Sequence, residues 1–223
     1  WHMIRAARTG VEALEGMKGL EPKIKNYGRL VGRKGVNVKP GQEVVVQSPV
    51  ECASFARGVV AEAYDAGAGH VTVIWADDAV TRLTYEHVEK SYFEQTPEWK
   101  RMQLDSLAQD GACFVFIEGA DPAALKGIDP AKPAAASKAR NTQCKVFRRG
   151  LDYNINPWCI AGAPVVAWAR EVFPGDADEV AIYKLWNAIL HTARADGQDP
   201  ESDWELHDAA FEKNLRFLND NRF

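Results

Sequence analysis

The chain has 223 residues, of which 46% are hydrophobic and 26% are charged, and its formal net charge is −4. A chain of this length can bury about 70% of the surface it exposes when unfolded, so it needs neither disulfides nor a structural metal in order to fold. The balanced composition excludes disorder, collagen-like repeats and a coiled coil. Acidic residues number 31 and basic residues 27, so the chain lacks the excess of positive charge that is typical of proteins that bind nucleic acid.

The cysteines are far apart in the sequence and include no Cys-x-x-Cys pair; they are Cys52, Cys113, Cys144 and Cys159. Each lies in or beside an apolar run, which predicts buried free thiols in a reducing compartment. No apolar run approaches the ~18 residues of a membrane span, and the N-terminal residues lack the hydrophobic core of a signal peptide. The sequence therefore predicts a cytoplasmic protein without a membrane segment.

Strand and helix patterns alternate through the first part of the chain. The β-branched run Glu43–Gln47 is typical of a strand. The Ser-Pro-Val-Glu segment at residues 48–51 follows it and predicts a helix start, with a capping box between its serine and its glutamate. That helix is expected to end at Gly67 as a left-handed cap. The nearly continuous apolar run His70–Trp75 then predicts a strand covered on both faces.

The elements after residue 76 continue the same alternation. Asp77 is placed to cap a helix, a second helix is expected from Thr96 to Gly111, and Ala112–Glu118 is a strand pattern. The remaining predicted elements are a long helix from Asp129 to about Arg149, a strand over Trp158–Ala161, a short helix ending before Pro174, and two final helices, Asp178 to Ala195 and Pro200 to about Asn221.

This order of elements predicts a helix-rich α/β fold with mainly parallel strands joined by right-handed crossovers. A softer break between about Asp105 and Gly111 separates two groups of elements. We therefore expect two α/β subdomains, at residues 22–108 and 109–223. Residues 1–21 are expected to form an N-terminal extension of unknown role.

The standard local signatures of catalysis are missing from the sequence. It contains no G-x-G-x-x-G, no phosphate-binding G-x-x-x-x-G-K-[ST], no G-x-S-x-G and no H-E-x-x-H. These absences exclude the standard local forms of a dinucleotide site, a nucleophilic serine elbow and a zinc-peptidase helix.

Four polar residues occupy the ends of predicted strands, where open α/β sheets place their ligand sites; they are Ser48, Asp77, Asp78 and Glu118. The adjacent carboxylates of Asp77 and Asp78 could share a proton or meet a cation or ammonium group. Helix capping explains the same pair, because Asp77 would cap the next helix and Asp78 would favour its positive end. The residues by themselves leave both interpretations open.

Several short segments between about Lys25 and Phe223 share their order and spacing with one known family; they are Asn26–Leu30, Gly35–Val38, Pro40–Gln42, Ala61–Ala68, Trp75–Arg82, Pro97–Trp99, Lys126–Pro130, Ala167–Ala169, Leu185–Trp186, Arg194–Gly197 and Asp199–Pro200. Together they resemble the thermophilic-type metalloaminopeptidases, the family of aminopeptidase T, AmpS and PepS. The resemblance covers almost the whole chain except its first two dozen residues.

The resemblance implies two α/β subdomains followed by a catalytic pseudo-β-barrel domain that binds two divalent metal ions, Co²⁺, Zn²⁺ or Mg²⁺. The family's metal ligands lie in motifs such as P-T-E-E, L-G-E and D-E-N-A-x-x-H, and none of these strings occurs here. No metal ligand of the family can therefore be assigned to a residue of this chain. The catalytic barrel domain is expected to be absent.

The function implied by the resemblance is that of a cytosolic aminopeptidase that removes N-terminal residues from peptides by two-metal hydrolysis. This chain would be its N-terminal region, inactive alone, serving as scaffold and as one wall of the substrate cavity. Its expected partners are the missing C-terminal catalytic domain and a second copy in a homodimer. Two alternatives remain: a standalone non-catalytic binding or structural module, and a small-molecule binder that uses Ser48, Asp77 and Glu118.

Overall fold

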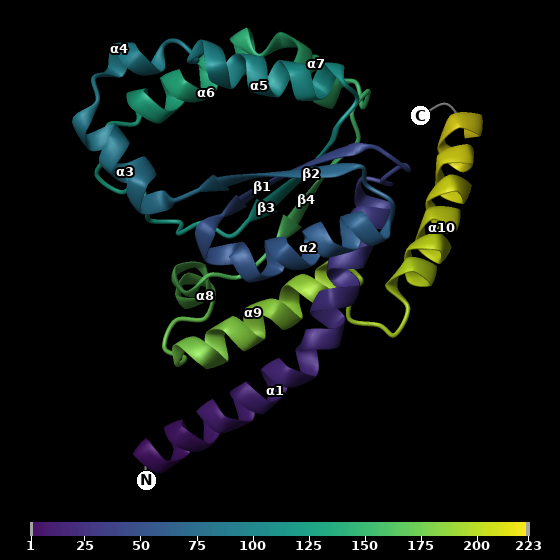
Figure 1. Ribbon diagram of the computed structural model, residues 1–223. Coiled ribbons are helices and arrows are strands. Elements are labelled where there is room, and N and C mark those ends of the chain that lie inside the picture. The colour runs from purple at the N-terminus through teal and green to yellow at the C-terminus, as the bar shows by residue number, and fades with distance from the viewer. Residues whose placement is uncertain (1, 222–223) are drawn as a thin grey trace.

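The structure is a computed structural model that describes the backbone of residues 2–221 and the side chains of residues 15–221. A central parallel sheet lies between two layers of helices (Figure 1). This arrangement confirms the predicted helix-rich α/β class. Within the described residues, no helix is both long enough and apolar enough to cross a membrane.

The described residues contribute four parallel strands to one sheet, in the order β2-β1-β3-β4; the strands are β1 (Glu43–Pro49), β2 (His70–Ala76), β3 (Cys113–Glu118) and β4 (Trp158–Gly162). Strand β1 is central, and its valines at positions 44, 45 and 46 have no exposed surface. Strand β2 is at the edge, where Trp75 is 44% exposed. The predicted cover on both faces of β2 holds in part: Val73 packs against the hydrophobic core on one face and Ile74 against the core on the other, whereas the end of the strand at Trp75 is open to solvent.

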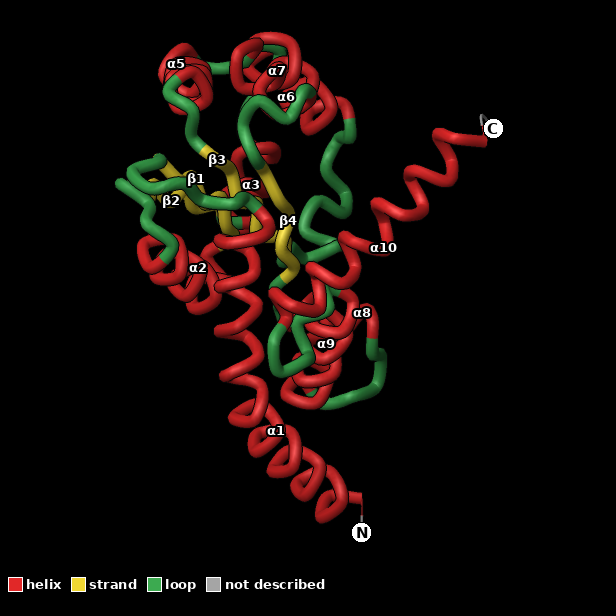
Figure 2. The backbone as a smooth tube through the Cα atoms, turned by 90° about the vertical axis from the view of Figure 1, so that its right-hand side faces the viewer, coloured by secondary structure: helices red, strands yellow, loops and turns green. Residues whose placement is uncertain are grey.

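The helices divide between the two faces of the sheet (Figures 1 and 2). One layer contains α1 (His2–Leu30), α2 (Ala53–Asp65), α8 (Val166–Val172) and α9 (Asp178–Thr192). The other contains α3 (Asp78–His87), α4 (Lys90–Phe93), α5 (Glu98–Gln109), α6 (Ala131–Gln143) and α7 (Lys145–Asp152). Helix α10 (Pro200–Asn221) lies to one side and extends away from the sheet. A π-helix, Val31–Gly35, follows α1, and a short 3-10 helix, Val50–Cys52, precedes α2.

Two hydrophobic cores lie on opposite faces of the sheet, and β1 contributes to both. Val44 and Val46 belong to the core with α1, α2 and α9, whereas Val45 belongs to the core under α5 and α7. The first core contains Phe55, whose ring centroid lies 5.2 Å from that of Tyr27. Because side chains alternate across a strand, a continuous valine run supplies both layers at once.

The local helix signals at two places differ from the structure. Ser48 caps no helix: it lies buried within β1, and its Oγ donates a hydrogen bond to the Pro49 carbonyl at 2.9 Å. The long helix expected from Asp129 to about Arg149 is two helices, α6 and α7, which meet at Cys144. By contrast, Gly67 has a φ of +101°, which confirms the predicted left-handed conformation after α2.

The predicted division into two subdomains remains a prediction. Its boundary at residues 108 and 109 falls between strands of one continuous sheet. The proposed N-terminal extension ends inside α1, where Leu20 before the boundary and Tyr27 after it share one core. The cysteines, in contrast, are free in the structure, as expected, and only Cys159 among them is less than fully buried.

Candidate functional site

The carboxyl ends of β1 and β3 form the switch point of the sheet. The chain leaves β1 through α2 on one face, and it leaves β3 through α6 and α7 on the other (Figure 1). In open α/β sheets, ligands bind in the crevice that such opposite crossovers create. The predicted site residues Ser48 and Glu118 lie near the carboxyl ends of these two strands.

Asp77 and Asp78 have separate backbone partners. The Asp77 carboxylate accepts a hydrogen bond from the Val80 amide at 3.0 Å and caps α3. The Asp78 carboxylate accepts one from the Asp121 amide at 3.0 Å and joins α3 to the loop after β3. Each aspartate therefore has a structural partner that differs from the other's.

The thiol of Cys52 lies between the strand ends. Its Sγ is 3.6 Å from the Ala163 carbonyl oxygen, which follows β4. The pKa of this thiol is raised from 9.0 to about 11, mainly by burial and to a smaller extent by the nearby charges of Glu51, Asp78 and Glu118. The thiol is therefore protonated at neutral pH and is a poor nucleophile.

The crevice is tightly packed beside Cys52. A Cβ atom placed on Gly119 would lie 2.4 Å from both the Cys52 Sγ and the Ala163 carbonyl oxygen. Such distances leave no room for a side chain, so glycine at this position allows three backbone segments to approach closely. No local sequence pattern predicts this cluster, because Cys52, Gly119 and Ala163 come from three segments far apart in the chain.

The residues present do not fit the two-metal centre that the family resemblance implies. In the part of the chain that the structure describes, no three His, Cys, Asp or Glu side chains group so that they could hold a metal ion. Asp78, which is half-buried, already accepts the Asp121 amide, while Glu118 is exposed. No catalytic step through a metal is therefore assigned to these residues.

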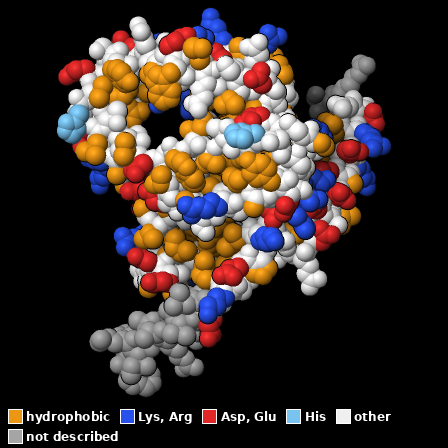
Figure 3. All heavy atoms as spheres, viewed as in Figure 1, with side chains coloured by type: hydrophobic (Ala, Val, Ile, Leu, Met, Phe, Trp, Pro, Cys, Tyr) orange, Lys and Arg blue, Asp and Glu red, His pale blue; other side chains and the backbone are white. Residues whose placement is uncertain are grey.

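A cavity of about 700 Å³ opens beside the end of β2. Figure 3 shows a hollow at this place, bordered by hydrophobic side chains. Asp77 lines this cavity together with residues of α3, α4, α5 and α6, whereas Ser48, Asp78 and Glu118 do not line it. The structure therefore separates Asp77 from the other three predicted site residues.

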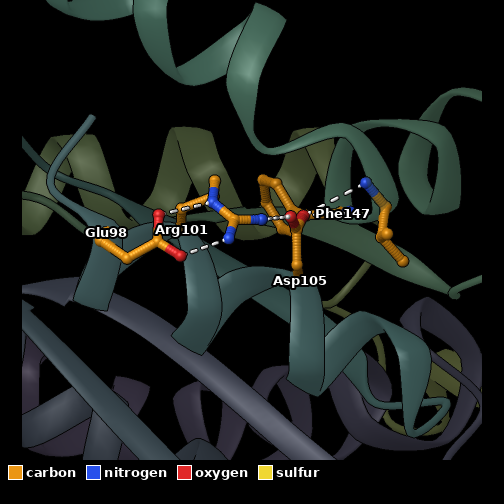
Figure 4. A network of polar contacts seen from close by, with 5 residues as sticks. Glu98, Arg101, Asp105 and Phe147 are labelled. Carbon is orange, nitrogen blue, oxygen red and sulfur yellow. Dashed lines mark hydrogen bonds and ion pairs between the residues drawn. The ribbon is translucent and has the colours of Figure 1, made fainter. Parts of the chain in front are cut away.

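Helix α5, which forms part of the cavity wall, is tied to α7 by a polar network (Figure 4). The buried Asp105 carboxylate accepts hydrogen bonds from the Val146 and Phe147 amides at 3.1 and 3.0 Å. Arg101 contacts the other Asp105 oxygen at 3.4 Å and pairs with Glu98. These contacts supply acceptors for the first turn of α7 and explain why a new helix begins there.

Comparisons with known proteins identify the family. The sequence profile of the thermophilic metalloprotease (M29) family matches residues 20–223. The chain belongs to this family. The match confirms the resemblance drawn from the short segments, and it begins within α1.

Relatives of the M29 chain cover nearly all of it. Aminopeptidase AmpS from Bacillus subtilis is 35% identical over 207 residues, which are 93% of this chain and 50% of AmpS. Aminopeptidase T from Thermus thermophilus is 32% identical over 93% of this chain and 51% of its own length. The solved structure of wild-type AmpT from Thermus thermophilus matches with a TM-score of 0.81 at 31% identity, covering 92% of this chain and 50% of AmpT. The chain thus spans about half the length of these relatives.

Proposed function

We propose that this chain is the N-terminal α/β region of a cytosolic, metal-dependent aminopeptidase that hydrolyses N-terminal residues from peptides. The observation that carries the proposal is the match to aminopeptidases over 93% of this chain and about half of each relative. A chain with this fold would supply the scaffold and one wall of the substrate cavity.

The partner in this proposal is a C-terminal catalytic domain that holds the two divalent metal ions, Co²⁺, Zn²⁺ or Mg²⁺. Such a domain has the length that the relatives possess in addition to the matched region. Helix α10 supports this partner, because it presents large hydrophobic side chains that are 73%, 63%, 58% and 52% exposed: Leu206, Phe211, Leu215 and Leu218. Exposed apolar surface of this extent is typical of an interface. The complete enzyme is proposed to be a homodimer.

An activity assay tests the proposal that the chain alone is inactive. The purified 223-residue chain is mixed with aminoacyl-4-nitroanilides and Co²⁺, Zn²⁺ or Mg²⁺, and full-length aminopeptidase T serves as the positive control. We expect no release of nitroaniline by the chain, since its described residues offer no metal-binding group. Turnover that requires metal and stops with a chelator would contradict this assignment.

The downstream reading frame distinguishes the proposal from a standalone binding or structural module. Translation that continues past Phe223 into P-T-E-E and D-E-N-A-x-x-H motifs supports the aminopeptidase assignment. A stop codon directly after Phe223 favours the standalone module.

A further inference from the structure

The end of β2 and helices α3, α4, α5 and α6 form most of the wall of the cavity beside β2. The aromatic and charged side chains that line it include Trp75, Asp77, Tyr85, Tyr92, Phe93, Lys100 and Arg140. Its volume of about 700 Å³ is within the range of small-molecule sites, roughly 300–1,000 Å³.

Aromatic side chains form the apolar part of the cavity. The ring of Phe93 lies 4.9 Å from that of Tyr85 and 5.6 Å from that of Tyr92, measured between centroids. Phe93 is buried, whereas Tyr92 is 57% exposed and Trp75 is 44% exposed. These partly exposed rings offer faces and edges against which a flat or branched apolar group can pack.

Two cationic side chains at the cavity have no acidic partner. Neither the Lys100 nor the Arg140 side chain makes a hydrogen bond or an ion pair with any residue that the structure describes; Lys100 lies only over the ring of Trp99, at 5.4 Å. Among the described lining residues, Asp77 is the sole carboxylate, and one of its oxygens caps α3. The cavity therefore has an excess of positive charge.

A protonated hydroxyl, that of Tyr85, lies close enough to Arg140 to feel its charge. Burial raises the pKa of Tyr85, and the charge of Arg140 opposes that increase only in part. The Tyr85 side chain is therefore a neutral hydroxyl at physiological pH and is able to donate a hydrogen bond. Cations and a hydroxyl donor beside an apolar wall are complementary to a carboxylate that carries a hydrophobic group.

We infer that this cavity binds a small carboxylate with an aromatic or branched apolar body. The carboxylate pairs with Lys100 and Arg140, and the apolar body packs against Tyr85, Tyr92 and Phe93. This site goes beyond the proposed function, because it requires neither a metal ion nor peptide hydrolysis.

Isothermal titration calorimetry with 4-phenylbutyrate tests the inference, and the neutral 4-phenylbutyramide serves as the matched ligand. We expect saturable binding of the carboxylate and about tenfold weaker binding of the amide, as a lost charge-assisted hydrogen bond implies. Lys100→Gln and Arg140→Gln should each weaken carboxylate binding about tenfold and leave amide binding unchanged. Tyr92→Ala should weaken the binding of both ligands.

Lys138→Gln is the control variant, because Lys138 is a cation of the same helix as Arg140 but does not line the cavity. It should bind both ligands as the unchanged chain does, and circular dichroism checks that every variant folds. Absence of saturable 4-phenylbutyrate binding would overturn the inference. So would equal affinity for the acid and the amide, or an equal loss in Lys138→Gln and Arg140→Gln.

Discussion

At the residue scale, the polar side chains at the strand ends mainly serve the backbone. Asp77 accepts the Val80 amide, Asp78 accepts the Asp121 amide, and Ser48 donates to the Pro49 carbonyl. Backbone groups at the ends of strands and helices lack partners within their own element, so nearby carboxylates and hydroxyls pair with them. Three of the residues that the sequence offered as candidates for a ligand site, Ser48, Asp77 and Asp78, therefore have structural partners here.

Replacing Asp77 tests this capping role. Asp77→Ala removes the acceptor for the Val80 amide and should lower the free energy of unfolding by about 1 kcal/mol. Asp77→Asn keeps an acceptor and should retain most of the stability. Urea denaturation of the three proteins measures the difference. If the alanine and asparagine variants lose the same stability, the charge of Asp77 matters and the cap does not.

At the element scale, a contact between two helices decides where α7 begins. Cys144 interrupts the pattern that predicted one long helix, and α7 starts again directly after it. The Asp105 carboxylate of α5 accepts the amides of the first turn of α7. A side chain about forty positions earlier in the chain thus determines a helix start, which local periodicity cannot reveal.

The Asp105 contact predicts a large effect for one substitution. Asp105 is 8% exposed, and Asp105→Ala leaves two α7 amides and Arg101 without this acceptor, so we expect a loss of about 2 kcal/mol in unfolding free energy. Glu98→Gln in the same network should cost much less, because Glu98 is exposed and solvent screens its ion pair with Arg101. Chemical denaturation measures both variants. Equal losses in the two variants would show that the network acts through its exposed ion pair.

At the scale of the whole molecule, one sheet supports two cores, and the core shared by α1, α2 and α9 holds several neutral titratable groups. Burial raises the pKa of Cys52 and of Cys113 from 9.0 to about 11, and that of Cys159 to about 12. It also raises the pKa of Tyr27 from 10.0 to about 12. The folded protein therefore keeps protons that the unfolded chain releases at lower pH.

This difference predicts a loss of stability in alkali. Below about pH 9 the thiols are protonated in both states, and the stability is fully present. As the pH rises from about 9 toward 11, the unfolded chain binds fewer protons than the folded one, so the free energy of unfolding must fall. Urea denaturation between about pH 8 and 10.5 measures the slope, and Cys52→Ala should make it shallower. A flat profile would contradict the burial of these thiols.

Local patterns in the sequence predicted those features that depend on neighbours within a few positions. The valine run of β1, the cap at Asp77 and the left-handed Gly67 are all present as expected. The edge position of β2 was not predictable, because a short apolar run has the same sequence pattern in a central strand and in a partly exposed edge strand. The same limit applies to Ser48, whose serine-proline pattern suits either a helix start or the end of a strand.

The sequence by itself determined the α/β class and the family membership, and it shows that the family's metal-ligand motifs are absent from this chain. Only the tertiary structure decided the strand order, the cluster of Cys52, Gly119 and Ala163, and the cavity with Lys100 and Arg140. The physical reason is that propensity and periodicity depend on neighbours within about one helical turn. Strand order and cavities depend instead on how side chains far apart in the chain exclude water together.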